Sequence, residues 1–188
     1  MRNRVKTLLV YMDHGKGVKK FYEDYIKRLN YAGFNVEGFC LTLNPPGNRM
    51  TFLEMDKKFK RKDLDLEILY KELKKKADKN EVLILYNGAN LHPEFLKELK
   101  TFNAYMCFDD PESSDTLSKP VAKYFDACFV GNIASINQYI KWGCKNVFFR
   151  PLGFFEDQRH IKNLSKQKIK NRNEDIDVSF FCERHSMW

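Results

Sequence analysis

The sequence predicts an α/β fold: a doubly wound, mostly parallel sheet with helices on both faces, spanning residues 1–155. Short apolar runs of strand length alternate with amphipathic helical patterns throughout this range. Each apolar run ends in a polar residue or a glycine, and such alternation implies crossover connections between parallel strands. Hydrophobic residues make up 43% of the 188 residues, which is enough to close a core.

The first three elements are a strand, a helix and a strand. Residues 5–12 form a compact apolar segment with the length of a buried strand. Residues 18–31 place apolar side chains at spacings of three and four, which predicts an amphipathic helix ending near Gly33. Residues 36–43 predict the second strand, which is closed by the helix breakers of residues 44–48.

Two more helix–strand pairs follow. Residues 64–77 carry leucine and isoleucine on one face and lysine elsewhere, which predicts a helix. The apolar run 81–86 predicts the third strand. Residues 92–100 predict a helix with a proline in its first turn, where the missing N–H costs nothing. Residues 104–108 predict the fourth strand, which runs into Asp109.

The last part of the domain repeats the alternation. Residues 117–125 predict a helix that begins with polar caps and accepts a proline near its start. Residues 127–130 predict the fifth strand, and residues 134–142 predict a helix ended by a glycine. Residues 146–152 predict the final strand of the sheet.

The composition changes after Gly153. Residues 156–176 are rich in Lys, Asn, Arg and Gln and predict a basic polar linker. Residues 177–188 begin with a run typical of a strand. This run is either the first strand of a second domain that continues beyond this sequence, or a terminal strand that pairs back onto the first sheet.

Charge and cysteine content narrow the classes of partner. Lys and Arg exceed Asp and Glu by 33 to 25, a net charge of +8 that favours phosphates, acidic sugars, nucleic acid or an anionic membrane surface. The five cysteines are scattered without a C-x-x-C pair, which favours buried free thiols and gives no reason to expect a metal. No apolar stretch is long enough to span a bilayer or to form a signal peptide, so we expect a cytoplasmic protein.

A basic run occupies residues 57–62. No helix-turn-helix, RRM or zinc-finger pattern accompanies it, so the sequence disfavours a nucleic-acid partner. The run is typical of a solvated loop, or it could rest against anionic lipid head groups on the inner face of a membrane.

Ligands of an open parallel sheet bind beyond the carboxyl ends of its strands. The candidate substrate-binding residues are those that follow the predicted strands: Gly15, Lys16, Gly17, Asn87, Gly88, Glu112, Ser113 and Arg150. The first loop matches neither a dinucleotide fingerprint nor a P-loop. Its glycines either form a turn alone or let a ligand approach the next helix, whose free N–H groups favour anions.

Four side chains at the same edge are candidates for acid–base chemistry. His14 follows the first strand, and an imidazole can accept a hydroxyl proton near neutral pH. Asp13 is the alternative base. A base of this kind needs a carboxylate to orient it, and Asp109 or Asp110 after the fourth strand could serve. An exposed loop histidine without a role is an equally good interpretation of His14.

Several segments together carry a resemblance to a known family. They are residues 107–114, 119–120, 124–130, 139, 142–143 and 146–153. In order and spacing they resemble the N-terminal domain of GT-B glycosyltransferases, with the spore-maturation-protein (CgeB-like) group of bacterial enzymes as the nearest. Residues 177–181 also look like the opening strand of that family's second domain.

The resemblance implies a Rossmann-like acceptor-side domain, one half of a GT-B fold that works in cell-surface glycan biosynthesis. A sugar acceptor would bind here, and a nucleotide-sugar would bind through a C-terminal domain absent from this sequence. The resemblance implies no bound metal, and it implies a histidine base oriented by an aspartate, roles that fall on His14 with Asp109 or Asp110. The isolated chain would then be inactive. The alternative is a non-catalytic α/β module that binds a ligand or a partner.

Overall fold

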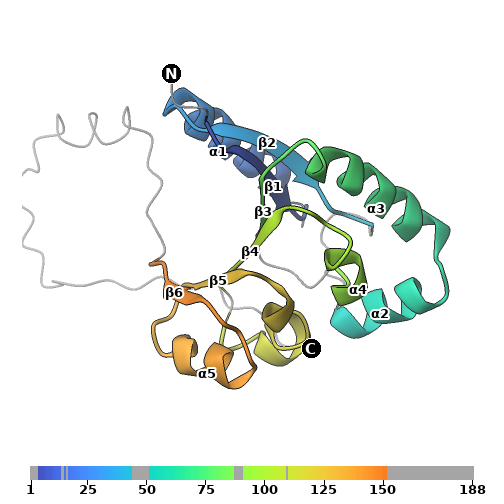
Figure 1. The fold of residues 1–188 in the computed structure, drawn as a ribbon, viewed down its shortest axis with the longest axis vertical. Coiled ribbons are helices and arrows are strands. Elements are labelled where there is room, and N and C mark those ends of the chain that lie inside the picture. The colour runs from blue at the N-terminus through green and yellow to red at the C-terminus, as the bar shows by residue number, and fades with distance from the viewer. Residues whose placement is uncertain are drawn as a thin grey trace, which may run out of the picture. The chain divides into compact units, whose positions relative to one another are not determined.

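Six strands form one sheet, and every adjacent pair runs parallel. The strand order is β2-β1-β3-β4-β5-β6 (Figure 1). The strands are β1 (Lys6–Tyr11), β2 (Asn35–Cys40), β3 (Val82–Tyr86), β4 (Phe102–Cys107), β5 (Ala127–Val130) and β6 (Val147–Phe149). The computed structural model describes residues 4–13, 15, 17–43, 51–86, 91–108 and 110–151. The predicted α/β class with a parallel sheet is confirmed.

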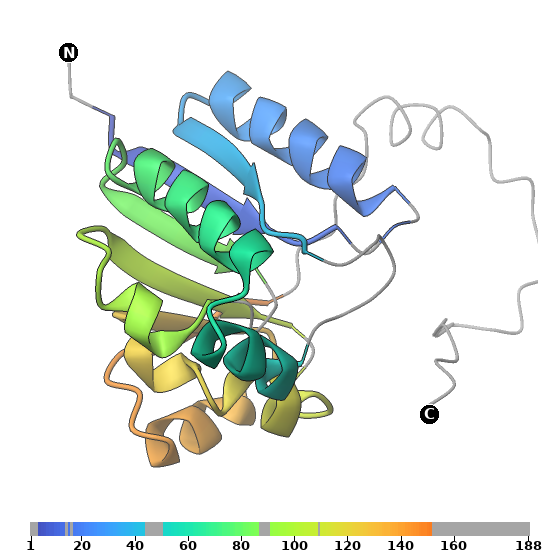
Figure 2. The same cartoon turned by 90° about the vertical axis from the view of Figure 1, so that its right-hand side faces the viewer.

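The helices lie on both faces of this sheet. They are α1 (Val18–Tyr31), α2 (Phe52–Lys60), α3 (Leu64–Ala77), α4 (Pro93–Leu96) and α5 (Ser135–Lys141), with a π-helical turn η1 (Ser114–Ser118) and a 3-10 turn η2 (Ala122–Tyr124). Side chains of α1 pack on one face of the sheet, and those of α3, α4 and α5 pack on the other (Figures 1 and 2). None of the helices in the described ranges is long and apolar enough to cross a membrane.

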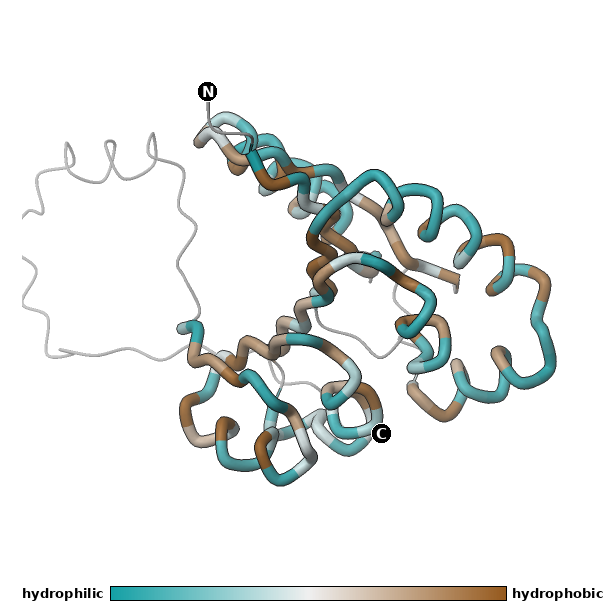
Figure 3. The backbone as a smooth tube through the Cα atoms, in the orientation of Figure 1, coloured by the Kyte–Doolittle hydropathy of each residue, from teal (hydrophilic) through white to brown (hydrophobic). Residues whose placement is uncertain are grey.

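Alternation along the central strands builds two cores. In β1, Leu8 and Val10 enter the larger core under α3, whereas Leu9 and Tyr11 enter the smaller core under α1. All four side chains are almost fully buried. A strand that is covered on both faces has a continuous run of apolar residues in its sequence. The central strands are accordingly the most hydrophobic part of the trace (Figure 3).

The order of the strands reverses its direction between β1 and β3. The chain moves from β1 outward to β2, and then back past β1 to β3 and onward to β6. The crossover from β1 to β2 and the later crossovers run in opposite directions across the sheet, so right-handed connections put their helices on opposite faces. Among the described helices, α1 therefore covers one face and the others cover the opposite face. Ligands of doubly wound sheets bind at this kind of reversal, outside the carboxyl ends of the strands.

Some elements differ from their predicted form. Helix α2 was not predicted, although Thr51 and Glu54 form a complete capping box at its start. The helix predicted over residues 117–125 is replaced by η1 and η2, because Pro120 cannot donate the hydrogen bond that a continuous helix needs there. Strand β6 is shorter than the predicted range 146–152.

The chain divides into one compact unit, Met1–Leu152, and a second, Gly153–Trp188. The predicted linker, residues 156–176, and the predicted strand that opens residues 177–188 lie outside the described residues. Both therefore remain predictions.

Candidate functional site

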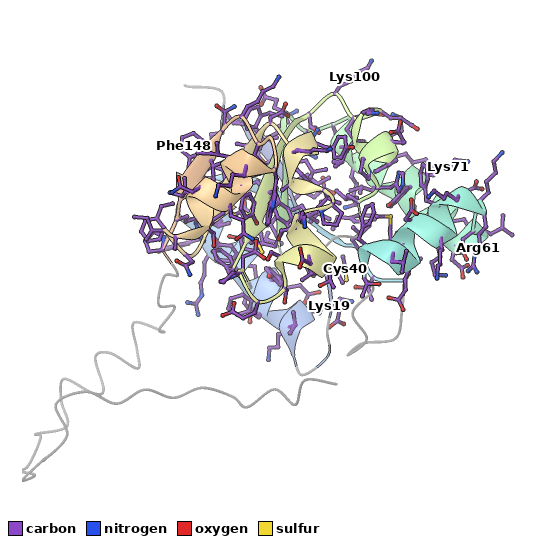
Figure 4. All side chains as sticks on the ribbon, turned by 90° about the horizontal axis from the view of Figure 1, so that it is seen from below. Lys19, Cys40, Arg61, Lys71, Lys100 and Phe148 are labelled. Carbon is purple, nitrogen blue, oxygen red and sulfur yellow. The ribbon has the colours of Figure 1, made fainter. Side chains whose placement is uncertain are left out.

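The carboxyl ends of all six strands lie along one edge of the sheet, because all neighbours are parallel. Cys40 ends β2 and Lys19 lies in the first turn of α1, and both lie toward this edge (Figure 4). Lys100 precedes β4 and lies on the opposite side of the domain. The described residues that directly follow the strands, such as Asp13, Asp110 and Arg150, belong to the carboxyl edge.

The loop after β1 is held by hydrogen bonds of Asp13. Its backbone N–H donates to the Thr42 hydroxyl at 2.8 Å, and its Oδ1 accepts from the Gly15 N–H at 2.9 Å. Gly15 and Gly17 have φ of 77° and 84°, a region that other residues avoid. The glycines of this loop are therefore required by its turn, whatever the loop binds.

Helix α1 starts from this loop with its positive end exposed. Gly17 is the N-cap and has no side chain that could bond the first N–H groups. The first turn holds no acidic residue. The partial positive charge of the helix terminus is thus left uncompensated within the described part of the loop, which favours anions there.

Four tyrosines gather beside this helix end. We call Tyr11, Tyr22, Tyr25 and Tyr86 the tyrosine cluster; they come from the end of β1, from α1 and from the end of β3. The Tyr11 and Tyr22 rings stack at 4.7 Å, and the Tyr22 and Tyr86 rings meet edge to face at 5.5 Å. The Tyr25 and Tyr86 hydroxyls lie 3.4 Å apart. The cluster therefore packs between α1 and the sheet, at the carboxyl ends of β1 and β3.

Burial raises the pKa of Tyr11 and of Tyr86 above the ordinary value. Both hydroxyls are protonated at neutral pH, as an ordinary tyrosine hydroxyl is, and that of Tyr86 is engaged with the Tyr25 hydroxyl. An aromatic wall with hydroxyl donors can hold a ligand that presents C–H groups and polar groups together. Sequence reasoning placed Tyr22 and Tyr25 on the apolar face of a helix and so missed this surface.

Arg150 extends the aromatic wall across the sheet. Its backbone N–H donates to the Val130 carbonyl at 2.9 Å, and its guanidinium lies 5.4 Å from the centre of the Phe108 ring. The Phe108 ring lies 5.9 Å from that of Tyr86. Phe108 approaches Gly131 so closely that a Cβ on this glycine would lie 2.9 Å from the ring. The absence of a side chain at Gly131 therefore sets the position of the Phe108 ring, over which the guanidinium of Arg150 lies.

The sheet face beyond Phe108 is less covered. Phe129 of β5 alternates with Cys128 and Val130, which point into the larger core, and its ring stacks on Phe148 at 5.4 Å. Phe148 is 50% exposed. Within the described ranges, the helix residues that pack on the smaller core all come from α1.

Asp110 occupies a different environment, on the side of the larger core. Its side chain is buried, and its Oδ2 accepts a hydrogen bond from the Tyr139 hydroxyl of α5. Burial also raises the pKa of Tyr139, which keeps this donor protonated. The other carboxyl oxygen, Oδ1, is buried without a hydrogen-bond partner in the described part of the structure. One acceptor of Asp110 is therefore left for a further donor.

Glu112 and Ser113 lead into η1. Glu112 is exposed, whereas the Ser113 carbonyl accepts from the N–H groups of Thr116 and Leu117. Neither side chain contacts the tyrosine cluster in the described structure. Five predicted site residues lie outside the described residues: His14, Lys16, Asn87, Gly88 and Asp109.

The helical layer carries a separate hollow of about 400 Å³. It lies among α2, α3 and α4, with an apolar floor that includes Phe59, Leu66 and Phe95 and a rim of charged residues. Its lining includes no residue of the carboxyl edge. In the described ranges, no group of three or more His, Cys, Asp or Glu side chains could hold a metal ion.

No family model matches this sequence, and no curated protein matches it either. The function is therefore inferred from the residues of the carboxyl edge.

Proposed function

We propose that this domain is the acceptor-side half of a glycosyltransferase, which places a hydroxyl-bearing acceptor for sugar transfer from a nucleotide-sugar. The observation that carries the proposal is the tyrosine cluster at the reversal of strand order, extended by Phe108 and Arg150. Sugar rings present C–H groups that pack on aromatic faces and hydroxyls that bond to side chains such as Tyr25 and Tyr86. The resemblance of the sequence to GT-B N-terminal domains agrees with this surface.

The proposed reaction is a displacement at the anomeric carbon of the donor sugar. A base, His14 or Asp13, removes the proton of the acceptor hydroxyl, and the resulting oxygen forms the new glycosidic bond. The bond to the nucleoside diphosphate breaks, and the diphosphate leaves with the electron pair. Asp109 or Asp110 orients the base, and the open Oδ1 of Asp110 is an acceptor suited to this role.

The donor would bind through a second domain, and helix termini with basic side chains would stabilise its diphosphate without a metal. In this proposal the protein is cytoplasmic, as the sequence predicts, and its acceptor is a glycan, a lipid-linked glycan or a protein. A lipid-linked acceptor would bring the domain to the inner face of the membrane.

The second candidate is a non-catalytic α/β module that binds a ligand or partner at the same edge. One observation favours it: both described candidate carboxylates are already hydrogen-bonded inside the domain, Asp13 to the Gly15 N–H and Asp110 to the Tyr139 hydroxyl. Each of these carboxylates therefore has a role inside the domain that needs no catalysis.

Saturation-transfer NMR on the full chain tests the proposal. A panel of neutral and anionic monosaccharides and disaccharides is compared with adenosine and riboflavin at matched concentrations. We expect transfer to the C–H protons of at least one saccharide, reduced at least threefold in Tyr25→Phe and Tyr86→Phe. Tyr31→Phe is the control, because Tyr31 is 96% exposed and ends the same helix, α1. Transfer to adenosine or riboflavin alone would favour the second candidate instead.

A further inference from the structure

Arg150 is a fixed, partly buried cation. Its backbone is fixed by the hydrogen bond to Val130 that continues the β5–β6 ladder. Its guanidinium lies over the Phe108 ring, where the negative face of the π system attracts a cation. A side chain held at both ends in this way is oriented before any ligand arrives, so it loses little freedom on binding.

The charge of Arg150 is not neutralised by a carboxylate in the described part of the chain. Other basic residues with well-placed acids do form pairs; Arg61, for example, lies 2.6 Å from Asp63. None of the ion pairs between described residues includes Arg150. A planar guanidinium without a partner is suited to bidentate binding of an oxyanion such as phosphate or carboxylate.

Neutral donors stand beside this cation. The Phe108 ring bridges Arg150 and Tyr86, and the Tyr86 hydroxyl lies 3.4 Å from that of Tyr25. The charge of Arg150 acts on Tyr86 strongly enough to oppose part of the rise that burial causes in the pKa of this tyrosine. The Phe108 ring thus lies 5.4 Å from the Arg150 guanidinium and 5.9 Å from the Tyr86 ring, which brings a cation and a tyrosine to one aromatic ring.

We propose that Arg150, Phe108 and Tyr86 form a binding site for the oxyanion of a charged sugar, a sugar phosphate or a uronate, whose ring lies against the tyrosine cluster. This inference rests on the proposed function and narrows its acceptor to an anionic saccharide. Phosphate and carboxylate share the geometry that the guanidinium recognises, so the experiment compares the two.

The test is an NMR titration of the full chain labelled with ¹⁵N at the arginine side chains. The probes are glucose 1-phosphate, glucuronate, neutral glucose and inorganic phosphate. We expect the Arg150 Nε signal to move with glucose 1-phosphate or glucuronate. Whichever of the two binds more tightly identifies the anion. Neutral glucose should bind at least tenfold more weakly, because the ion pair is then lost.

Variants separate a site from general attraction to a basic protein. Arg150→Gln should weaken binding of the charged sugar about tenfold. Arg150→Lys should weaken it less, because lysine keeps the charge but loses the planar guanidinium that binds an oxyanion with two hydrogen bonds. Arg28→Gln is the matched control, since it removes one exposed positive charge from the last turn of α1. Backbone amide spectra of each variant check that the fold is intact.

The outcomes separate this inference from the proposed function. Equal weakening by Arg150→Gln and Arg28→Gln would overturn the site, because binding would then follow net charge. Saccharide binding that is indifferent to Arg150 would overturn the site and leave the proposed function standing. Inorganic phosphate that binds through Arg150 as tightly as glucose 1-phosphate would overturn the sugar ligand and count against the proposed function.

Discussion

The Tyr139 hydroxyl donates a hydrogen bond to Oδ2 of Asp110, which joins helix α5 to the loop that follows β4. Both residues are buried, and the Tyr139 ring also packs against Trp142 at 4.8 Å. The bond connects two parts of the carboxyl edge that are separated by η1, η2 and β5. It anchors the side chain of Asp110 to α5.

Tyr139→Phe should lower the free energy of unfolding by about 2 kcal/mol, because it removes a hydrogen bond to a buried carboxyl group. Urea unfolding checks this value, with an unchanged slope indicating that the folded state stays compact. Tyr31→Phe should change the free energy by less than about 0.5 kcal/mol, since Tyr31 is exposed. Equal effects of the two changes would contradict a specific role for the bond.

Asp63 should make the domain sensitive to acid. Hydrogen bonds from Arg61 and Lys58, and from the Leu66 N–H that Asp63 caps, lower its pKa to about 2. The value in the unfolded chain is about 4, so the stabilisation is complete above about pH 4 and is lost as the pH falls toward 2.

Asp63→Asn keeps an N-cap but removes this titration. The melting temperature of the variant should therefore fall less steeply than that of the parent between about pH 4 and pH 2. Asp65→Asn, in the first turn of the same helix, is the control and should follow the parent. Parallel curves for the parent and Asp63→Asn would show that another carboxylate controls the acid response.

Thr51→Ala should destabilise helix α2 by about 1 kcal/mol. The Thr51 hydroxyl accepts from the Glu54 N–H at 3.4 Å, and the Glu54 carboxylate accepts from the Thr51 N–H at 2.8 Å. Thr51→Ser retains both bonds and should behave like the parent. Amide hydrogen exchange at Glu54 measures the effect locally, and unchanged exchange in Thr51→Ala would mean that tertiary packing alone holds the start of the helix.

The basic run 57–62 should give weak binding to anionic vesicles. Lys58 and Arg61 both pair with Asp63, and Lys60 pairs with Asp56. Lys57 and Lys62 are outside these pairs, so Lys57→Gln/Lys62→Gln should reduce flotation with phosphatidylserine vesicles several-fold, at about 1 kcal/mol per lysine.

Lys60→Gln/Lys100→Gln removes the same charge and provides the comparison, because Lys60 is already paired and Lys100 lies elsewhere on the domain (Figure 4). An equal loss in both double variants would indicate attraction by net charge and not by the run. Flotation that is absent in the parent would rule out this surface as a membrane contact.

The strands could be predicted because the parallel sheet buries them on both faces. Leu83 and Leu85 of β3, for example, are fully buried, and a segment of this kind must be apolar throughout. Helix α2 escaped prediction because its buried residue, Met55, stands among lysines and acids that mask the apolar period. The signal that could have found it is Thr51 three residues before Glu54.

The candidate site was predictable only in outline. The rule that ligands bind beyond strand ends selected Arg150, but it could not show that the side chain reaches Phe108. Tyr22 and Tyr25 have the spacing of any buried helix face, and only the packing of α1 against Tyr86 brings them to the carboxyl ends of β1 and β3. Contacts between distant segments such as these leave no local pattern in a sequence.

The pairing of β1 with β2 and β3 sets an order for folding. Thr7 lies beside Val36 on one side and beside Val82 on the other. During synthesis, β1 therefore gains its second neighbour only after β3 has emerged from the ribosome. The described strands pair only in parallel, so none of them joins β1 in a hairpin. Parallel pairing of distant segments is slow to form, and the waiting strand is apolar and prone to associate with other chains. We expect the nascent N-terminal segment to depend on chaperones until residue 86 has left the ribosome.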